Sequence, residues 1–243
     1  TVNGNLITFM KRYDDSGLNV APINTVSRAV YRDTIMSAGT PYGMIGWEGN
    51  LGSNGGYQTG TTGTFFFMHQ STNCRFTVYW VYRNIIAENT TTTKCLFGTS
   101  NATGEQGVIL TQNGAVLNGP RTFSLAVRNN TAGQNAFSIT FPPFQSSAQT
   151  YSVYSVRCSA VGASIGDNVA SSYINGVKVN STTLTNALHT GGTAAFAMTV
   201  GNRPSNTLRF NGYVGELIIF NQQHDEATHL KICNHLKHKW RIT

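Results

Sequence analysis

The chain has 243 residues, of which only 11% are charged, and a formal net charge of +7. A chain of this length fits one large all-β domain and can bury a sizeable core without metals or disulfides. The positive charge favours contact with polyanions such as acidic glycans, lipopolysaccharide or nucleic acid. We expect no specific nucleic-acid binding, because Lys and Arg are dense only near the C-terminus. We also expect no membrane span, because no apolar run approaches the roughly 18 residues needed.

The first 60 residues carry weak structural patterning. Residues 6–10 predict a strand, and a stretch around Val30 predicts another strand or a short helix. Glycine is dense across residues 39–63, which predicts long irregular loops. We therefore separate a glycine-rich segment, residues 1–60, from a main domain, residues 61–243. The first segment is expected to belong to the same sandwich or to form an arm that contacts a neighbouring subunit.

Regular structure is predicted from residues 65–67 onward. The strongest strand signal is Phe76–Tyr82, which places Phe76, Val78, Trp80 and Tyr82 on one face. Further short strands are predicted at residues 95–97, 107–110, 122–127, 136–141, 151–158 and 196–201. Turns are predicted at Asn113-Gly114 and Asn118-Gly119, because these dipeptides tolerate positive φ.

A hairpin and a closing strand with its helix are the clearest elements. Residues 172–179 contain two β-rich arms joined at Asn175-Gly176. Residues 210–221 predict a strand that is apolar on both faces. A helix then runs to Trp240, with acidic residues in its first turn and basic residues in its last. Its predicted apolar stripe comprises Ala227, Leu230, Cys233, Leu236 and Trp240.

These elements predict an all-β fold of about a dozen antiparallel strands and one C-terminal helix. No other segment shows sustained helical periodicity. Short strands at this spacing are typical of two packed sheets. The fold class expected from the residues is therefore a two-sheet antiparallel jelly-roll sandwich.

Four stretches then resemble a known family. They are Phe76–Arg83, Tyr173-Ile174-Asn175-Gly176-Val177, the strand from Phe210 to Asn221 and the helix from Asp225 to Trp240. Together they resemble laminin G-like domains of the concanavalin A-like lectin/glucanase superfamily, over roughly residues 65–243. The resemblance implies two curved antiparallel sheets whose concave face or loop rim often binds carbohydrate, sometimes with calcium. Such domains are frequent in phage and viral surface proteins and in secreted bacterial adhesins and enzymes.

The residues argue against catalysis. Glucanases of this superfamily carry an E-x-D-x-x-E pattern, since glycoside hydrolysis needs two carboxyl groups roughly 5–9.5 Å apart. This chain has ten acidic residues and no such pattern. Glu216 is expected to be structural, so the chain is predicted not to be an enzyme. A glycoside hydrolase is a remote alternative that requires Glu48, Glu88 or Glu105 to converge with Glu216.

The candidate metal ligands and the cysteines are also expected to be structural. Asp167, followed by Asn168, is a weak calcium candidate that fits an ordinary turn better, so no cofactor is predicted. His229 with Cys233, and His235 with His238, could share helix faces and bind a transition metal, but a solvated basic face is favoured. Cys74, Cys95, Cys158 and Cys233 are predicted to be buried free thiols, with one or two disulfides as the alternative.

Amide, hydroxyl and aromatic side chains in loops remain as binding chemistry, because amides bond sugar hydroxyls and rings cover apolar sugar faces. The candidate ligand-binding residues are Trp47, Tyr57, Asn168, Asn202 and Arg203. For Trp47 and Tyr57, a lid over the core is favoured over a stacking platform for a sugar. We thus predict a non-catalytic binding or decoration module on a virion, phage fibre or cell surface that recognises glycans. The alternative is a purely structural capsid or fibre component, with other structural proteins or further copies of the chain as partners.

Overall fold

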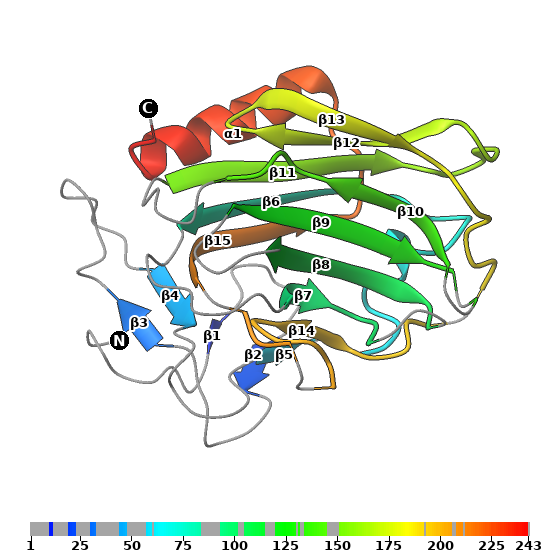
Figure 1. The fold of residues 1–243 in the computed structure, drawn as a ribbon, viewed down its shortest axis with the longest axis horizontal. Coiled ribbons are helices and arrows are strands. Elements are labelled where there is room, and N and C mark those ends of the chain that lie inside the picture. Colours follow the sequence, from blue (N-terminus) through cyan, green and yellow to red (C-terminus); the bar gives the residue numbers. More distant parts are fainter. Residues whose placement is uncertain are drawn as a thin grey trace.

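The computed structural model (Figure 1) places two antiparallel sheets and one α-helix in the described part of the chain. The described residues are 10–11, 19–22, 30–32, 44–47, 57–59, 61–83, 93–101, 105–114, 120–129, 131, 134–144, 151–191, 193–205, 208–210 and 212–242. The predicted turn at Asn118-Gly119 lies outside them. No helix among these residues is long and apolar enough to span a membrane.

The larger sheet has eight strands. Their order is β1 (Met10–Lys11), β2 (Asn19–Pro22), β5 (Tyr57–Thr59), β14 (Met198–Val200), β7 (Lys94–Gly98), β8 (Gly107–Gly114), β9 (Arg121–Arg128) and β10 (Asn135–Thr140). The second sheet has seven strands. Their order is β13 (Val177–Thr183), β12 (Asn168–Ile174), β11 (Tyr151–Ser159), β6 (Arg75–Arg83), β15 (Gly212–Phe220), β4 (Met44–Trp47) and β3 (Val30–Arg32).

The two sheets confirm the predicted all-β sandwich. Consecutive and distant strands pair antiparallel, as in β6 with β11 and β15. The two outermost strands β10 and β13 also meet, where the Asn180 side-chain amide donates to the carbonyl oxygen of Thr140 at 3.0 Å. The described strands of residues 1–60 lie in both sheets. The proposed boundary after residue 60 and the subunit-contacting arm stay predictions.

The core between the sheets is aromatic. The predicted inner face of β6 is confirmed, since Phe76, Val78, Trp80 and Tyr82 all belong to this core. The Trp80 ring stacks on Tyr154 with centroids 5.6 Å apart. Trp80 also meets Phe123 edge to face at 5.4 Å. Such pairs add about 0.5–1.5 kcal/mol each beyond simple area burial. The Trp80–Tyr154 pair joins neighbouring strands of one sheet, and the Trp80–Phe123 pair joins the two sheets.

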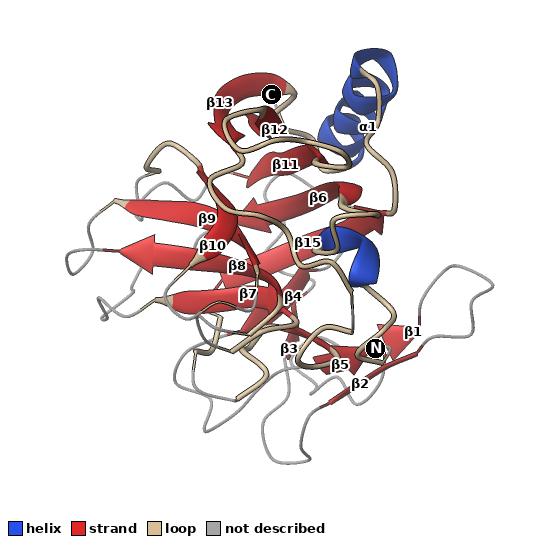
Figure 2. Ribbon diagram, turned by 90° about the vertical axis from the view of Figure 1, so that its right-hand side faces the viewer, coloured by secondary structure: helices blue, strands red, loops and turns tan. Residues whose placement is uncertain are grey.

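The outer face of the seven-stranded sheet is covered by α1 (Glu226–Lys239). Figure 2 shows the helix beside β11 and β12, on the side away from β7 to β10. The Asp225 carboxylate caps the helix by accepting from the Thr228 backbone N–H at 2.7 Å. Between the helix and the sheet lies a second apolar cluster, formed by Tyr79, Val81 and Val153 from the strands and Cys233, Leu236 and Trp240 from the helix and its C-terminal end. The helix therefore buries a sheet face that would otherwise be open to solvent.

Part of the predicted helix stripe is wrong. Leu230 is 39% exposed and Ala227 is also exposed, whereas His229 is completely buried. The sheet surface explains the exchange, because the Ser155 hydroxyl lies beneath the helix and bonds the His229 Nε2 at 2.8 Å. A polar patch on the sheet thus selects a histidine at a position that periodicity would give to an apolar residue.

The hairpin prediction is confirmed, and two local predictions are not. Asn175 and Gly176 join β12 to β13 with φ of 52° and 86°, the left-handed pair that a tight hairpin turn needs. Asn113-Gly114, by contrast, continues β8 and pairs with Thr122 and Arg121. Residues 66–68 form a short 3-10 helix, which sequence periodicity did not indicate.

All four cysteines are buried and free, as predicted. The Cys74 and Cys158 sulfur atoms lie 3.9 Å apart where β6 begins and β11 ends. Burial raises the pKa of the Cys158 thiol well above its ordinary value, and the neighbouring Cys74 adds to the effect. These two thiols therefore pack as small apolar groups in the core.

The closing strand and the helix end are joined at Gly215. β15 changes register against β6 between Val214 and Glu216, and Trp240 lies over the glycine there. Trp240 Nε1 donates to Glu216 Oε1 at 2.6 Å, and Lys239 Nζ pairs with the same oxygen at 2.8 Å. The predicted structural role of Glu216 is confirmed, because its carboxylate holds the last helical turn on the sheet.

Replacing Gly215 should loosen this contact. A Cβ at position 215 would lie 2.5 Å from the Trp240 ring, so Gly215→Ala must displace the indole or bend the strand. We expect the free energy of unfolding to fall by about 1–3 kcal/mol, measured by urea denaturation. Gly191→Ala is the control, because a Cβ at position 191 meets nothing within 4 Å. Equal midpoints for the two variants would contradict this account of the strand and helix junction.

Candidate ligand-binding site

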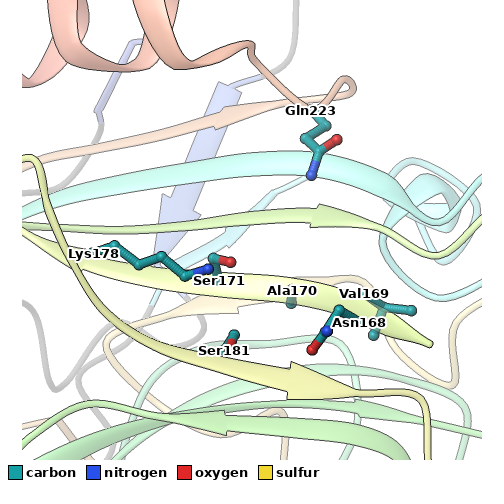
Figure 3. A pocket seen from close by; sticks show the side chains of 7 residues that line it. All are labelled: Asn168, Val169, Ala170, Ser171, Lys178, Ser181 and Gln223. Atoms are coloured by element: carbon teal, nitrogen blue, oxygen red, sulfur yellow. The ribbon is translucent and has the colours of Figure 1, made fainter. Parts of the chain in front are cut away.

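A groove lies on the hairpin formed by β12 and β13, beside the turn that precedes α1 (Figure 3). It has a volume of about 160 Å³ and is open to solvent. It is lined by Asn168, Val169, Ala170, Ser171, Lys178, Ser181 and Gln223. We call these residues the hairpin groove. Figure 3 shows Lys178 extending along the hairpin toward Ser171, while Gln223 reaches down from the turn before the helix.

Strand register brings the groove's polar groups to one face. Ser171 pairs with Ser181 across the hairpin, and Lys178 pairs with Tyr173. Ser171 also pairs with Arg157 of β11, whose side chain contacts the N-terminal turn of α1. Because side chains alternate between faces, these positions share the outer face of the sheet that carries the helix.

The groove presents side-chain donors and acceptors that the fold does not use. Asn168, Lys178, Ser181 and Gln223 are exposed, and Ser171 is half-buried. Within the described part of the chain, none of these five side chains makes a hydrogen bond or ion pair. The groove therefore offers two amides, two hydroxyls and one ammonium group to a ligand.

Arg157 fixes the wall of the groove nearest the helix. Its Nε donates to the backbone oxygen of His224 at 2.8 Å, and its Nη1 donates to the Tyr173 hydroxyl at 3.0 Å. The same nitrogen pairs with Glu226 in the first helical turn. On the other side of this turn, Thr77 Oγ1 donates to the Gln222 carbonyl oxygen at 2.9 Å. Gln223 is thus carried by a turn that is bonded to two strands of the sheet.

Asp167 shapes the end of the groove next to Asn168. Its Oδ2 accepts from the Ser164 backbone N–H at 2.8 Å, and its carbonyl oxygen accepts from Leu184 N at 2.9 Å. These bonds close a turn that contains Gly166 with φ of 100°. The carboxylate is used in the manner expected for a plain turn. The calcium alternative stays a prediction.

The histidines of the helix divide into two groups. His235 and His238 are exposed, as the solvated-face interpretation predicts, but that interpretation is wrong for His229. The His229 ring stacks on Tyr79 with centroids 5.6 Å apart, and Cys233 Sγ lies 3.5 Å from its Nε2. Burial, helped by the positive charge of Arg157, lowers the pKa of His229 to about 4. No group of three metal-ligating side chains occurs among the described residues.

The five sequence-predicted ligand residues do not gather in one place. Asn168 lines the groove, and Arg203 lies partly buried in the loop after β14. Tyr57 and Asn202 are completely buried, which fits the lid-like alternative for Tyr57. Trp47 lies on β4, and its side chain is outside the described part. Ligand contact by these residues stays a prediction.

Sequence reasoning missed the remaining groove residues. Ser171, Lys178 and Ser181 lie on strands, whereas the sequence predicted ligand contacts in loops. Their only sequence signal was the alternation of polar residues around the Asn175-Gly176 turn. Gln223 carries no signal of its own, because only the docking of the helix brings it to the hairpin.

The glutamates give no carboxyl pair within the described residues. Glu216 is held by Trp240 and Lys239 on the seven-stranded sheet. Glu105 precedes β8 of the other sheet, where its Oε2 accepts from the Asn101 backbone N–H at 2.6 Å. The other two glutamates of the remote hydrolase alternative, at positions 48 and 88, lie outside the described residues.

No family model and no curated protein sequence matches the chain. Solved structures do match by shape. A native heptameric SAP-like pentraxin from Limulus polyphemus has 14% identity and a TM-score of 0.52, covering 81% of this chain and 84% of its own. The CBM40 of a Ruminococcus gnavus IT-sialidase, bound to alpha2,3 sialyllactose, has 10% identity and a TM-score of 0.53, covering 78% and 96%.

Botulinum neurotoxin type C also matches, with 14% identity and a TM-score of 0.59 over 96% of this chain. The present chain spans about half, 51%, of that neurotoxin chain. Cell entry of that toxin is dependent upon interaction with two ganglioside molecules. At such identities the matches establish the fold alone, and they confirm the predicted jelly-roll sandwich of the concanavalin A-like type. The narrower laminin G-like assignment stays a prediction.

The buried histidine predicts an acid-sensitive helix contact. The pKa of His229 is about 4 in the folded protein and 6.5 ordinarily, so the folded state binds fewer protons between these values. The free energy of unfolding should therefore fall as pH falls from 6.5 to 4, by up to about 1.4 kcal/mol per pH unit from this residue. Urea denaturation across this window should show a shallower fall for His229→Phe.

His238→Gln is the matched control, because His238 is exposed on the same helix. This variant should keep the wild-type slope. Some acid dependence should remain in His229→Phe, because burial also lowers the pKa of His69 to about 4, with His189 contributing. An unchanged slope in His229→Phe would show that the helix contact does not depend on a neutral His229.

Proposed function

We propose that this protein is a non-catalytic carbohydrate-binding module that recognises an acidic glycan through the hairpin groove. The observation that carries the proposal is the set of polar side chains in the groove that make no hydrogen bond within the described residues. They lie beside a turn that Arg157 bonds to the sheet. Amides and hydroxyls match sugar hydroxyls as donors and acceptors, and Lys178 supplies one positive charge for an acidic substituent.

The size of the groove sets the mode of binding. Its volume of about 160 Å³ is below the roughly 300–1,000 Å³ of pockets that enclose drug-sized ligands. A groove of this size suits one sugar residue at the end or side of a chain, with the rest of the glycan in solvent. A terminal acidic sugar fits such a groove, because its ring is exposed at the end of the glycan and its carboxylate can pair with Lys178.

Two further findings support the choice of an acidic glycan. The net charge of +7 favours the approach of anionic ligands over a long range at low salt. Two structures of similar shape interact with such glycans: the CBM40 with alpha2,3 sialyllactose and the neurotoxin with gangliosides. Both are binding structures, which fits a module that holds a glycan without cleaving it.

Within this proposal the module acts at a surface, as a decoration on a virion, phage fibre or cell, or as a secreted adhesin. The same sandwich could instead serve a capsid or fibre by contacting other structural proteins or copies of itself. One structure of similar shape, the SAP-like pentraxin, is a heptamer, which supports this second role. Glycan binding by the monomeric chain would support the role as a surface binding module. An obligate assembly that binds no glycan would support the structural role.

The test is a glycan array probed with the labelled full chain at physiological salt. We expect binding to sialylated glycans and its loss after desialylation. Lys178→Gln should weaken binding by at least about tenfold, because a hydrogen bond to a charged group contributes roughly 1.5–3 kcal/mol. Lys231→Gln is the control, since Lys231 is an exposed lysine on α1 outside the groove.

Three outcomes would count against the proposal. One is the absence of any glycan signal, read beside the oligomeric state from light scattering. Another is an equal loss in Lys178→Gln and Lys231→Gln, which would indicate only general charge attraction. The third is a preference for neutral glycans that survives Lys178→Gln, which would keep carbohydrate binding but remove the acidic specificity.

A further inference from the structure

A cluster around Arg128 and Arg203 lies on the other sheet, away from the hairpin groove. Arg128 ends β9 two residues after Ala126, so both side chains point to the outer face of the eight-stranded sheet. Ala126 packs there with Cys95 and Ile109 in a small apolar cluster. Arg203 follows β14 in the neighbouring loop.

Hydrogen bonds join the loops that carry the two arginines. Arg128 Nη1 donates to Ser100 Oγ at 3.3 Å. The next residue, Asn101, accepts through its Oδ1 from the Ser205 backbone N–H at 2.5 Å. Arg203 N in turn donates to Asn202 Oδ1 at 2.8 Å. The loop after β7 and the loop after β14 are thereby tied together beside Arg128.

Both arginines hold a buried donor that the described residues leave unsatisfied. The Nε atoms of Arg128 and Arg203 are inaccessible to solvent and have no hydrogen-bond partner there. A buried donor without an acceptor costs about 1–3 kcal/mol, more when it is charged, so a native structure rarely keeps two together without a further partner. The missing partner must accept from planar N–H groups.

The charges of the cluster favour an anion. Burial lowers the pKa of the Arg128 guanidinium, Arg203 adds to this effect, and Glu105 opposes it. A second cation and one carboxylate therefore act on the same guanidinium group. The Glu105 Oε2 already accepts from the Asn101 backbone N–H. A further negative group at the two unsatisfied Nε atoms would relieve this repulsion.

We propose that Arg128 and Arg203 form a binding site for an oxyanion, a sulfate or carboxylate group, held by paired guanidinium forks. Guanidinium groups suit this role because their fixed planar donors match two oxygens of such an anion. The anion is either free in solution or a substituent of a saccharide, and the experiment below separates these sources. The site does not depend on the hairpin groove.

The experiment follows the Arg Nε–H signals of the 15N-labelled full chain during titration with sodium sulfate. Sodium chloride is reduced in step, so that ionic strength stays constant. We expect saturating shifts of the Arg128 and Arg203 signals only. Arg203→Lys and Arg128→Lys keep the charge but remove the fork, and each should weaken sulfate binding, read from the remaining signal, at least about tenfold.

Arg75→Lys is the matched control, because Arg75 is exposed at the start of β6 on the seven-stranded sheet. It should bind sulfate as the wild type does, and so should Lys178→Gln. Non-saturating shifts, or wild-type sulfate affinity in both arginine variants of the cluster, would overturn the proposal. A retained one-dimensional amide spectrum in each variant shows that lost binding is not lost folding.

A second arm compares a sulfated disaccharide with its unsulfated form. Arginine-dependent binding of the sulfated form, tighter than that of inorganic sulfate, identifies a saccharide substituent as the occupant. Equal binding of the sulfated form and inorganic sulfate identifies a free anion. Binding of the unsulfated form that survives both arginine variants would contradict an oxyanion site. These outcomes do not depend on the glycan array, so they can still be interpreted if the array shows no binding or no effect of Lys178→Gln.

Discussion

The docking of α1 on the outer face of the seven-stranded sheet is the contact on which the rest of this structure depends. The sheet has apolar side chains on both faces of β6 and β15, so it needs a cover on the side away from the sandwich core. The helix supplies that cover through Cys233, Leu236 and Trp240. Gly215 makes close approach of the indole possible, and Glu216 bonds the indole nitrogen.

The same docking also organises the candidate binding groove. The turn before α1 is held by Thr77 from β6 and Arg157 from β11, and this turn carries Gln223 to the hairpin. Arg157 bonds Tyr173 as well, which ties the hairpin to the helix N-terminus. The groove's free polar groups therefore lie on a wall that is held from behind by the hydrogen bonds of Thr77 and Arg157. A binding site gains from this arrangement, since fixed walls lose little entropy when a ligand binds.

Local patterns in the sequence predicted the strands, turns and caps that depend only on neighbouring residues. The alternation of Phe76–Tyr82, the Asn175-Gly176 turn and the Asp225 cap all lie where expected, because each needs only its neighbours in the chain. Burial of His229 could not be predicted, since it depends on Ser155, which is distant in sequence. The groove was missed for the same reason. Of its polar residues only Asn168 stood out, because strand pairing and helix docking assemble the others.

The two candidate sites use positive charge in different ways, and their burial decides how each responds to salt. Lys178 is an exposed ammonium group in an open groove, where ions screen its attraction over a Debye length of about 8 Å at physiological salt. The Arg128 and Arg203 Nε atoms are inaccessible to solvent, so an anion that accepts from them is screened much less. An acidic ligand in the groove must therefore gain much of its affinity from hydroxyl and amide contacts. In the arginine cluster, charge and planar geometry suffice to hold an oxyanion.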